Sequence, residues 1–300
     1  MRQLLIIGGK RHLANTGHEM DKYLIINADD FGLNSSVNQA ILRGFLQGCL
    51  TSTSLIAVVP DEPFFEAIEI LKNNPGLDFG VHLALTSDVL TQYRPLSKNM
   101  PVDESGHFFK STFRYLKILA QKQTKSIVET ELRLQIEKVL ATGLKPSHLN
   151  SHYYATELPY FSDITASLAE EYQIKALRNP YETKSFIFSQ PFNLSKILIV
   201  QAIRVLAIIN YRKIGQHNLL TANNYYGVYS AGRMDTTRLL QVINSIKPGL
   251  SEILVHPALD DSTHFYESRE FESLISSQVS ELIKKKGITL TNYRDSAERA

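Results

Sequence analysis

Short apolar segments alternate with longer helical patterns along most of this chain, and this alternation limits its fold more than any other feature. The strand-like segments are apolar without strict in-out alternation, as expected when both faces of a sheet are covered. They span 23–27, 51–59, 78–85, 146–152, 174–179, 251–258 and 287–293. Helical patterns between them span 36–48, 62–74, 125–143, 158–172, 234–249 and 268–287. Repeated strand–helix units predict parallel strands with helices outside.

The kind of α/β fold follows from a missing motif. No GxGxxG turn is present, which favours a TIM-like (β/α) barrel, distorted or incomplete, over an open doubly wound sheet. The chain has no repeat and no glycine/serine linker, so we predict one domain over 23–300, preceded by an N-terminal extension, 1–22. The polar, less regular stretch 86–124 reads as an insertion after the second site strand.

Acids, histidines and an arginine gather where the predicted strands end. Ligands bind beyond these carboxyl ends in parallel α/β folds. The residues are Asp29, Asp30, His82, His148, Asn150, His152, Arg178 and His256. Each alone has an ordinary structural explanation, because paired acids before Phe-Gly are typical of a turn and a strand histidine is usually a hydrogen-bonded core residue. Their joint occurrence on several strands predicts a common site.

One carboxylate and two neutral imidazoles suit a divalent metal ion with open positions for water and substrate. We predict Asp30, His82 and His152 as ligands of one ion, magnesium or zinc. The adjacent Asp29 is then placed to take a proton from water, and His256 to protonate a leaving group.

Three further residues are expected beside these ligands. Arg178 would orient a carboxylate or keep Asp29 ionised, or would form an ordinary ion pair. Asn150 and His148 precede His152 on the same segment and are expected to contact the substrate or to support the ligands.

Composition narrows the class of protein. A net charge of +2 with no concentrated basic face argues against a dedicated nucleic-acid binder. The single cysteine, Cys49, allows no intrachain disulfide and no thiolate metal cluster. We therefore expect a reducing compartment and a cytoplasmic protein.

Several stretches together resemble one family. INADDFGLNSSVNQAI, LTSTSL, DFGVHLALT, PSHLNSH and EILVHPA occur in the order found in the YdjC-like carbohydrate deacetylases, over about 23–293. The resemblance implies a distorted β/α barrel and removal of N-acetyl groups from amino sugars. It also implies that Asp30, His82 and His152 bind the metal, that Asp29 is the base, and that His256 belongs to the catalytic site.

A later stretch, NYYGVYSAGRMDTTRLLQVINSIKPGLSEILVHPA, resembles the hopanoid-biosynthesis-associated HpnK branch of that family. This implies a substrate linked to a lipid, a hopanoid bearing glucosamine. The chain departs from many family members at Asn150, where they have aspartate, and at Tyr154 and Thr156, where they have histidines. The three predicted ligands are retained, but these changes bear on substrate contacts and on how well the site works.

The most apolar stretch, 195–213, allows two interpretations. An apolar run of this length is usually a core helix. Alternatively it lies on the inner face of a membrane, or forms an apolar wall for a lipid tail. The sequence leaves the oligomeric state open, a homodimer included.

Two other functions compete with deacetylation. A glycoside hydrolase would need a second carboxylate across the cleft from Asp29 or Asp30, and Asp260 and Asp261 are the available acids. A non-catalytic carbohydrate- or lipid-binding relative would bind sugar without metal and release no acetate.

Overall fold

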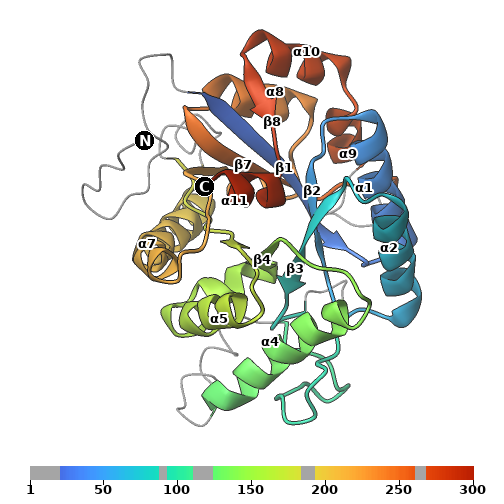
Figure 1. Ribbon diagram of the computed structural model, residues 1–300, viewed down its shortest axis with the longest axis vertical. Helices are drawn as coiled ribbons and strands as arrows, with labels where there is room; N and C mark the ends of the chain where they lie inside the picture. Colours follow the sequence, from blue (N-terminus) through green and yellow to red (C-terminus); the bar gives the residue numbers. More distant parts are fainter. Residues whose placement is uncertain (1–20, 88–92, 111–123, 184–192, 261–267) are drawn as a thin grey trace.

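The computed structural model describes residues 21–87, 93–110, 124–183, 193–260 and 268–300. The described strands form one curled sheet, with helices outside it (Figure 1). The strands are β1 Lys22–Phe31, β2 Ser52–Leu55, β3 Asp78–Leu83, β4 His148–Ser151, β5 Ala176–Leu177, β6 Asn224–Tyr226, β7 Gly249–Val255 and β8 Ile288–Leu290. The helices are α1 Ser35–Gln47, α2 Asp61–Asn73, α4 Lys125–Leu140, α5 Pro159–Glu171, α7 Leu194–Gln216, α8 Thr236–Ser245, α9 Ser268–Leu274, α10 Ser277–Lys285 and α11 Tyr293–Arg299, with a 3₁₀ segment, η2, at His152–Glu157.

Neighbouring strands follow the order β5-β4-β3-β2-β1-β7-β6, and the pairings between them are parallel. β8 pairs with the first residues of β1, whereas β2 pairs with its later residues. Two isolated parallel bridges, Ala176 with Leu220 and Glu182 with Tyr225, link the chain around β5 to the chain around β6. The sheet is a curled half-barrel, and the prediction of a single-domain, incomplete α/β barrel is confirmed.

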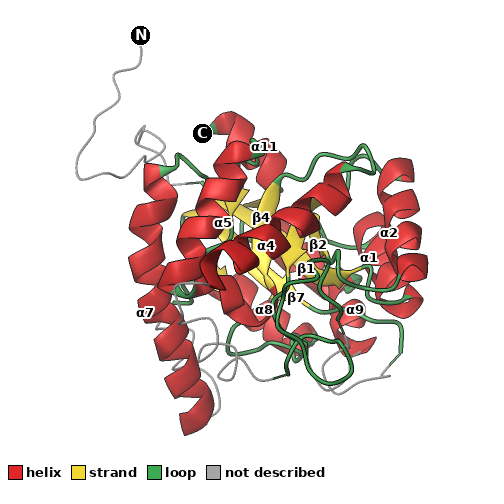
Figure 2. Ribbon diagram, turned by 90° about the horizontal axis from the view of Figure 1, so that it is seen from below, coloured by secondary structure: helices red, strands yellow, loops and turns green. Residues whose placement is uncertain are grey.

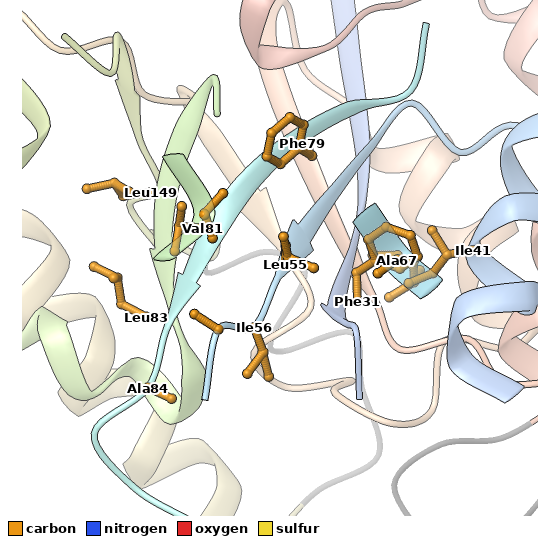
Figure 3. Close-up of a cluster of buried hydrophobic side chains, with 14 of the residues drawn as sticks. Phe31, Ile41, Leu55, Ile56, Ala67, Phe79, Val81, Leu83, Ala84 and Leu149 are labelled. Carbon is orange, nitrogen blue, oxygen red and sulfur yellow. The ribbon is translucent and has the colours of Figure 1, made fainter. Parts of the chain in front are cut away.

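The two faces of the sheet differ in chemistry, as β3 illustrates. Its outward side chains join a buried apolar cluster with residues of α1, α2 and β4 (Figure 3): Phe79, Val81 and Leu83. Alternation sends Gly80 and His82 to the other face. A Cβ added at Gly80 would lie 2.4 Å from the backbone oxygen of His148, so only glycine lets β3 and β4 approach this closely.

The predicted extension and insertion are described in part. Residues 1–20, 88–92 and 111–123 lie outside the described residues. The described part of the insertion packs on α4. The carboxylate of Glu131 on α4 accepts hydrogen bonds from the backbone N–H groups of Leu96 and Ser97 in the insertion, at 3.2 and 2.7 Å. The insertion also brings the Tyr93 ring to 5.2 Å from the His152 ring, between centroids. The insertion thus supplies part of the wall around the predicted site.

One predicted helix is wrong in extent. The pattern at 268–287 forms two helices, α9 and α10. The carbonyl oxygen of Leu274 accepts the backbone N–H of Cys49, from the turn after α1, at 3.1 Å. Ser276 then has ψ 126°, which is not helical. This hydrogen bond between distant segments therefore accompanies the end of α9 at Leu274, although the apolar pattern of the sequence alone predicts that the helix continues.

Candidate active site at the carboxyl edge of the sheet

Asp29 and Asp30 are successive residues, yet both side chains approach His82. Simple strand alternation would send them to opposite sides. The β1–β2 register shifts between Ala28 and Phe31, and Asp30 has φ 68°. This bulge re-aims the strand end, so that His82 Nε2 lies 3.4 Å from Asp30 Oδ1 and 3.7 Å from Asp29 Oδ2. Left-handed backbone at a non-glycine residue costs about 1–3 kcal/mol and tends to occur at functional sites.

Arg178, which follows β5, holds Asp29 at both carboxylate oxygens. Its Nη1 donates to Oδ2 at 2.6 Å and its Nη2 to Oδ1 at 2.8 Å. Both residues are buried, with exposures of 3% for Asp29 and 2% for Arg178. Burial alone would raise the pKa of Asp29, but the charge and hydrogen bonds of Arg178, together with the charges of His82 and His256, outweigh burial and hold that pKa well below its ordinary value. Asp29 is therefore an anion across the neutral pH range.

Arg178 has a second anionic partner, Glu252 on β7. Nε of Arg178 donates to Glu252 Oε1 at 2.8 Å, and the hydroxyl of Tyr293 donates to Glu252 Oε2. Burial opposes the charge of Arg178, but Asp29 and Glu252 more than offset it and raise the pKa of Arg178 well above its ordinary value. The guanidinium is thus a fixed cation shared by two buried carboxylates.

Asn150 determines which nitrogen of His82 faces the acids. Its Nδ2 donates to Asp29 Oδ1 at 3.1 Å and to Ser54 Oγ at 2.6 Å, which turns its Oδ1 towards His82 Nδ1 at 2.7 Å. Because an amide oxygen only accepts, Nδ1 carries the proton of a neutral His82 ring. Nε2 then presents a lone pair towards the two carboxylates.

Two acceptor atoms therefore face each other, His82 Nε2 and Asp30 Oδ1. Zinc holds nitrogen and oxygen ligands at about 2.0–2.2 Å, which places two tetrahedral ligands about 3.4 Å apart. The observed 3.4 Å separation fits two ligands of one ion. Among the described residues, no three His, Cys, Asp or Glu side chains are placed closely enough to form a metal site. The full set with His152 stays a prediction.

His152 lies beside this pair at the start of η2. Its ring centroid is 5.8 Å from that of His82 and 4.4 Å from that of Tyr153. Tyr153 and Tyr154 both have left-handed backbone, with φ 51° and 55°. Tyr153 is 42% exposed, whereas His152 is 5% exposed. The strained turn therefore keeps His152 inside and sets Tyr153 at the surface next to it.

His256 reaches the same region from the end of β7. Its backbone N–H donates to Glu270 Oε2 at 2.5 Å, which fixes the chain there. Burial lowers the pKa of His256, although the charges of Asp30 and Asp29 act in the opposite direction. Asp29, Asp30, His82, Asn150, Arg178 and His256 are thus brought to one edge, with His152 beside them.

His148 is not at this edge but below it, inside the sheet. Its Nε2 lies 3.2 Å from Ser54 Oγ and its Nδ1 2.9 Å from Ser147 Oγ, and its ring stacks on Tyr293 at 4.1 Å between centroids. Burial lowers its pKa well below the ordinary value, so the ring is neutral. The placement indicates a role in supporting the site rather than one in contacting substrate.

The family of the chain is shown by comparison with known proteins. Residues 23–285 match the family described as YdjC-like protein. The chain belongs to the YdjC-like family. Carbohydrate deacetylases from Clostridium beijerinckii and Enterococcus faecalis are 29% and 30% identical, covering 91% and 92% of this chain and 99% of each relative. A solved structure from Enterococcus faecalis V583, to which cellobiose-phosphate cleavage is ascribed, is 28% identical, with TM-score 0.70 over 92% of this chain and 99% of that one.

Sequence reasoning missed several groups that shape this YdjC-like site. Glu252 holds Arg178, and Asn27 Nδ2 donates to Asp29 Oδ1 and to Ser54 Oγ, both at 2.9 Å. Asn27, Ser54 and Glu252 are fully buried within strands β1, β2 and β7. A polar residue inside an apolar strand was the available signal, because such a residue must face a polar partner.

Proposed function

We propose that this chain removes an N-acetyl group from an amino sugar with the help of one divalent metal ion. Membership of the YdjC-like family and relatives named carbohydrate deacetylase support the reaction class. One observation carries the proposal: an anionic carboxylate held by a buried arginine stands beside a facing pair of metal-type donors.

Asp30, His82 and His152 would hold the ion, with Asn150 orienting His82. A bound magnesium or zinc ion would supply Lewis acidity for amide hydrolysis. The chemistry of the donors fits either metal, since one carboxylate and two imidazoles leave positions for water and substrate. The choice of metal is left to the experiment below.

Asp29 takes the proton of the attacking water in this proposal. Arg178 keeps Asp29 charged and aims its oxygens, but the lowered pKa also makes Asp29 a weaker base than an ordinary aspartate. A base this weak can deprotonate water only if the pKa of that water is itself lowered. A divalent metal ion would lower it, which is a reason for including a metal in the proposal. His256 passes a proton to the departing nitrogen; because its lowered pKa leaves the ring mostly neutral at pH 7, that proton is the one that Asp29 takes from water. Acetate and a free amino sugar are the products.

The narrower proposal is an amino sugar linked to a lipid, such as glucosamine on a hopanoid. It is supported by the exposed apolar residues of α7, a helix that packs beside the segment carrying His152. Soluble acetylated sugars are the competing substrates.

A glycoside hydrolase fits the geometry less well. Asp260, one of the two acids available as a partner, is exposed and accepts a hydrogen bond from Ser36 Oγ at 2.7 Å, in contrast to the buried Asp29. Asp261 lies outside the described residues. The histidines at the edge would also have no role in that reaction.

The test is acetate release from a panel of N-acetylglucosamine compounds, soluble and lipid-linked, with chelated protein and with zinc, magnesium or manganese restored. We expect acetate from at least one compound, loss of turnover on chelation and recovery with one of these metals. Release of reducing sugar without acetate would instead indicate a glycoside hydrolase. Sugar binding without acetate release or metal binding would indicate a non-catalytic relative.

A further inference from the structure

Helix α7 carries its apolar side chains on the outside. Seven large apolar residues, 39–62% exposed, form what we call the outer face of α7: Leu194, Leu198, Ile199, Val205, Ile208, Ile209 and Tyr211. Among the described residues, α7 alone is long and apolar enough to cross a membrane, and only 22% of its most apolar window is buried. The interpretation of 195–213 as a core helix is therefore wrong for this face.

The inner face of α7 holds polar contacts to the body of the protein. Asn210 Nδ2 donates to the backbone oxygen of Glu157 at 2.7 Å, and Arg204 Nη2 donates to Tyr181 Oη at 3.2 Å. Arg204 and Asn210 are 3% and 1% exposed. Four apolar residues of α7 are buried beside them, Val200, Ile203, Ala207 and Ile214, so the helix is apolar on its inner and outer sides. Because α7 is packed on the protein through these buried polar and apolar groups, its outer face is suited to lie on an apolar surface and not to span one.

Charge indicates which apolar surface this is. The 23 residues of α7 include Lys196, Arg204, Arg212 and Lys213 and no Asp or Glu. Arg233 and Arg238 lie near Lys196: partial burial first, and then their charges, lower its pKa. These three cations therefore lie near one another beside the N-terminal half of α7, where Lys196 Nζ contacts Tyr229, and cations beside an apolar face are the pattern that binds anionic lipid headgroups.

A second copy of the chain is a poorer occupant. In a symmetric dimer through α7, two arrangements are possible. Lys196, Arg233 and Arg238 would face either the same three cations of the second copy or the C-terminal end of its α7, near Arg212. The first arrangement opposes like charges, and in the second the partner end offers Arg212 and a Lys213 that is already paired with Asp163 at 2.8 Å. Anionic lipids would neutralise the cations instead.

The N-terminal half of α7 lies at the same edge of the sheet as the site. Lys196 Nζ donates to the backbone oxygen of Tyr229, just after β6, and Arg204 contacts Tyr181, just after β5. Figure 2 shows α7 extending past the neighbouring helices at one end. We infer that α7 binds the surface of an anionic bilayer through its outer face, with the site edge held next to the membrane.

The test is sedimentation of the full chain with vesicles of phosphatidylcholine alone or mixed equally with phosphatidylglycerol. The variant L198Q/V205Q/I209Q changes exposed residues of the outer face, and L46Q/F65Q changes residues 60% and 53% exposed on α1 and α2 as a matched control. We expect wild type and control to bind the mixed vesicles. The triple variant should bind at least ~10-fold more weakly, and salt should weaken wild-type binding.

Equal binding by the triple variant and wild type, or no binding by either, would overturn the inference. A wild-type dimer that ignores vesicles and becomes a monomer in the triple variant would assign the face to a second copy. The assay requires no turnover, so it can succeed even if the proposed deacetylation fails. The lipid-linked substrate does rest on that function: the triple variant should lose acetate release from vesicle-embedded substrate and keep it for soluble substrate.

Discussion

Asp29 and Asp78 are buried carboxylates at opposite edges of one sheet, and the protein treats them differently. Asp29, near the carboxyl end of β1, is held by both arms of the buried Arg178. Asp78, the first residue of β3, accepts hydrogen bonds through Oδ2 from Ser147 Oγ at 2.9 Å and other neutral donors, and the half-exposed Arg294 stays 3.6 Å away. The pKa of Asp29 is lowered, whereas burial raises that of Asp78 to about 6.

The difference shows what keeps a carboxylate charged inside a protein. At Asp78, neutral donors and the half-exposed Arg294 offset burial only in part, whereas at Asp29 the buried bidentate guanidinium, together with the charges of His82 and His256, more than offsets it. The two acids are also connected, because hydrogen-bonding groups of Ser54, His148 and Ser147 link one to the other. Above about pH 6 both carboxylates are anions, but only Asp29 keeps its charge at lower pH, and of the two only Asp29 stands beside His82 and Asp30.

The largest expected effect comes from removing Asp29, the proposed base. We predict that D29N lowers turnover by about 10²–10⁴-fold, because the amide cannot take the proton of water. The measurement is acetate release, together with metal content by elemental analysis. D78N, at the other edge, is the matched control and should keep its turnover. Loss of metal from D29N would mean that the roles of Asp29 and Asp30 are exchanged.

Removing the cation should give the next largest effect. We predict that R178M lowers the free energy of unfolding by about 3–5 kcal/mol, since Asp29 and Glu252 are then buried without their shared partner. R294M, next to Asp78, should cost less than about 1 kcal/mol because Arg294 is 45% exposed. Urea unfolding of both variants checks this, and R178K, which keeps the charge, should lie between them. Equal losses in R178M and R294M would remove the distinction between the two edges.

The smallest expected effect is a pH dependence of stability from Asp78. Its folded pKa of about 6 exceeds its ordinary value of 3.8, so the folded state binds the proton more tightly. Stability from Asp78 is therefore full below about pH 4 and is lost as pH rises through about 6. We predict that wild type loses roughly 1–3 kcal/mol relative to D78N over that window.

Asp29 has the opposite effect on how stability depends on pH, and it acts in a different pH range. Because its folded pKa is lowered, its contribution is present above the ordinary 3.8 and is lost only as pH falls below it. Denaturant titrations of wild type and D78N between about pH 4 and pH 7 therefore isolate Asp78. A difference that stays flat across this range would show that Asp78 is charged in the folded protein.

Much of the site could be predicted because parallel strands end on one edge. The strand-end positions of Asp29, Asp30, His82, Arg178 and His256 predicted residues that the structure does bring together. The same pattern left open whether His148 contacts the substrate or supports the ligands, and its place one layer deeper, against Ser54, favours support. The alternation of residues along a strand predicts which face of the sheet a side chain points to, but not how far from the carboxyl edge it lies.

By itself, the sequence determined the alternation of strands and helices, the half-barrel that follows from it, and the edge at which the polar residues collect. Tertiary structure alone decided that Asp30 adopts φ 68°, so that two successive acids reach His82, and that Glu252 on a distant strand fixes Arg178. It also decided which face of α7 points outward. Local patterns specify elements, but register, bulges and partners depend on contacts between segments far apart in the chain, which no local pattern encodes.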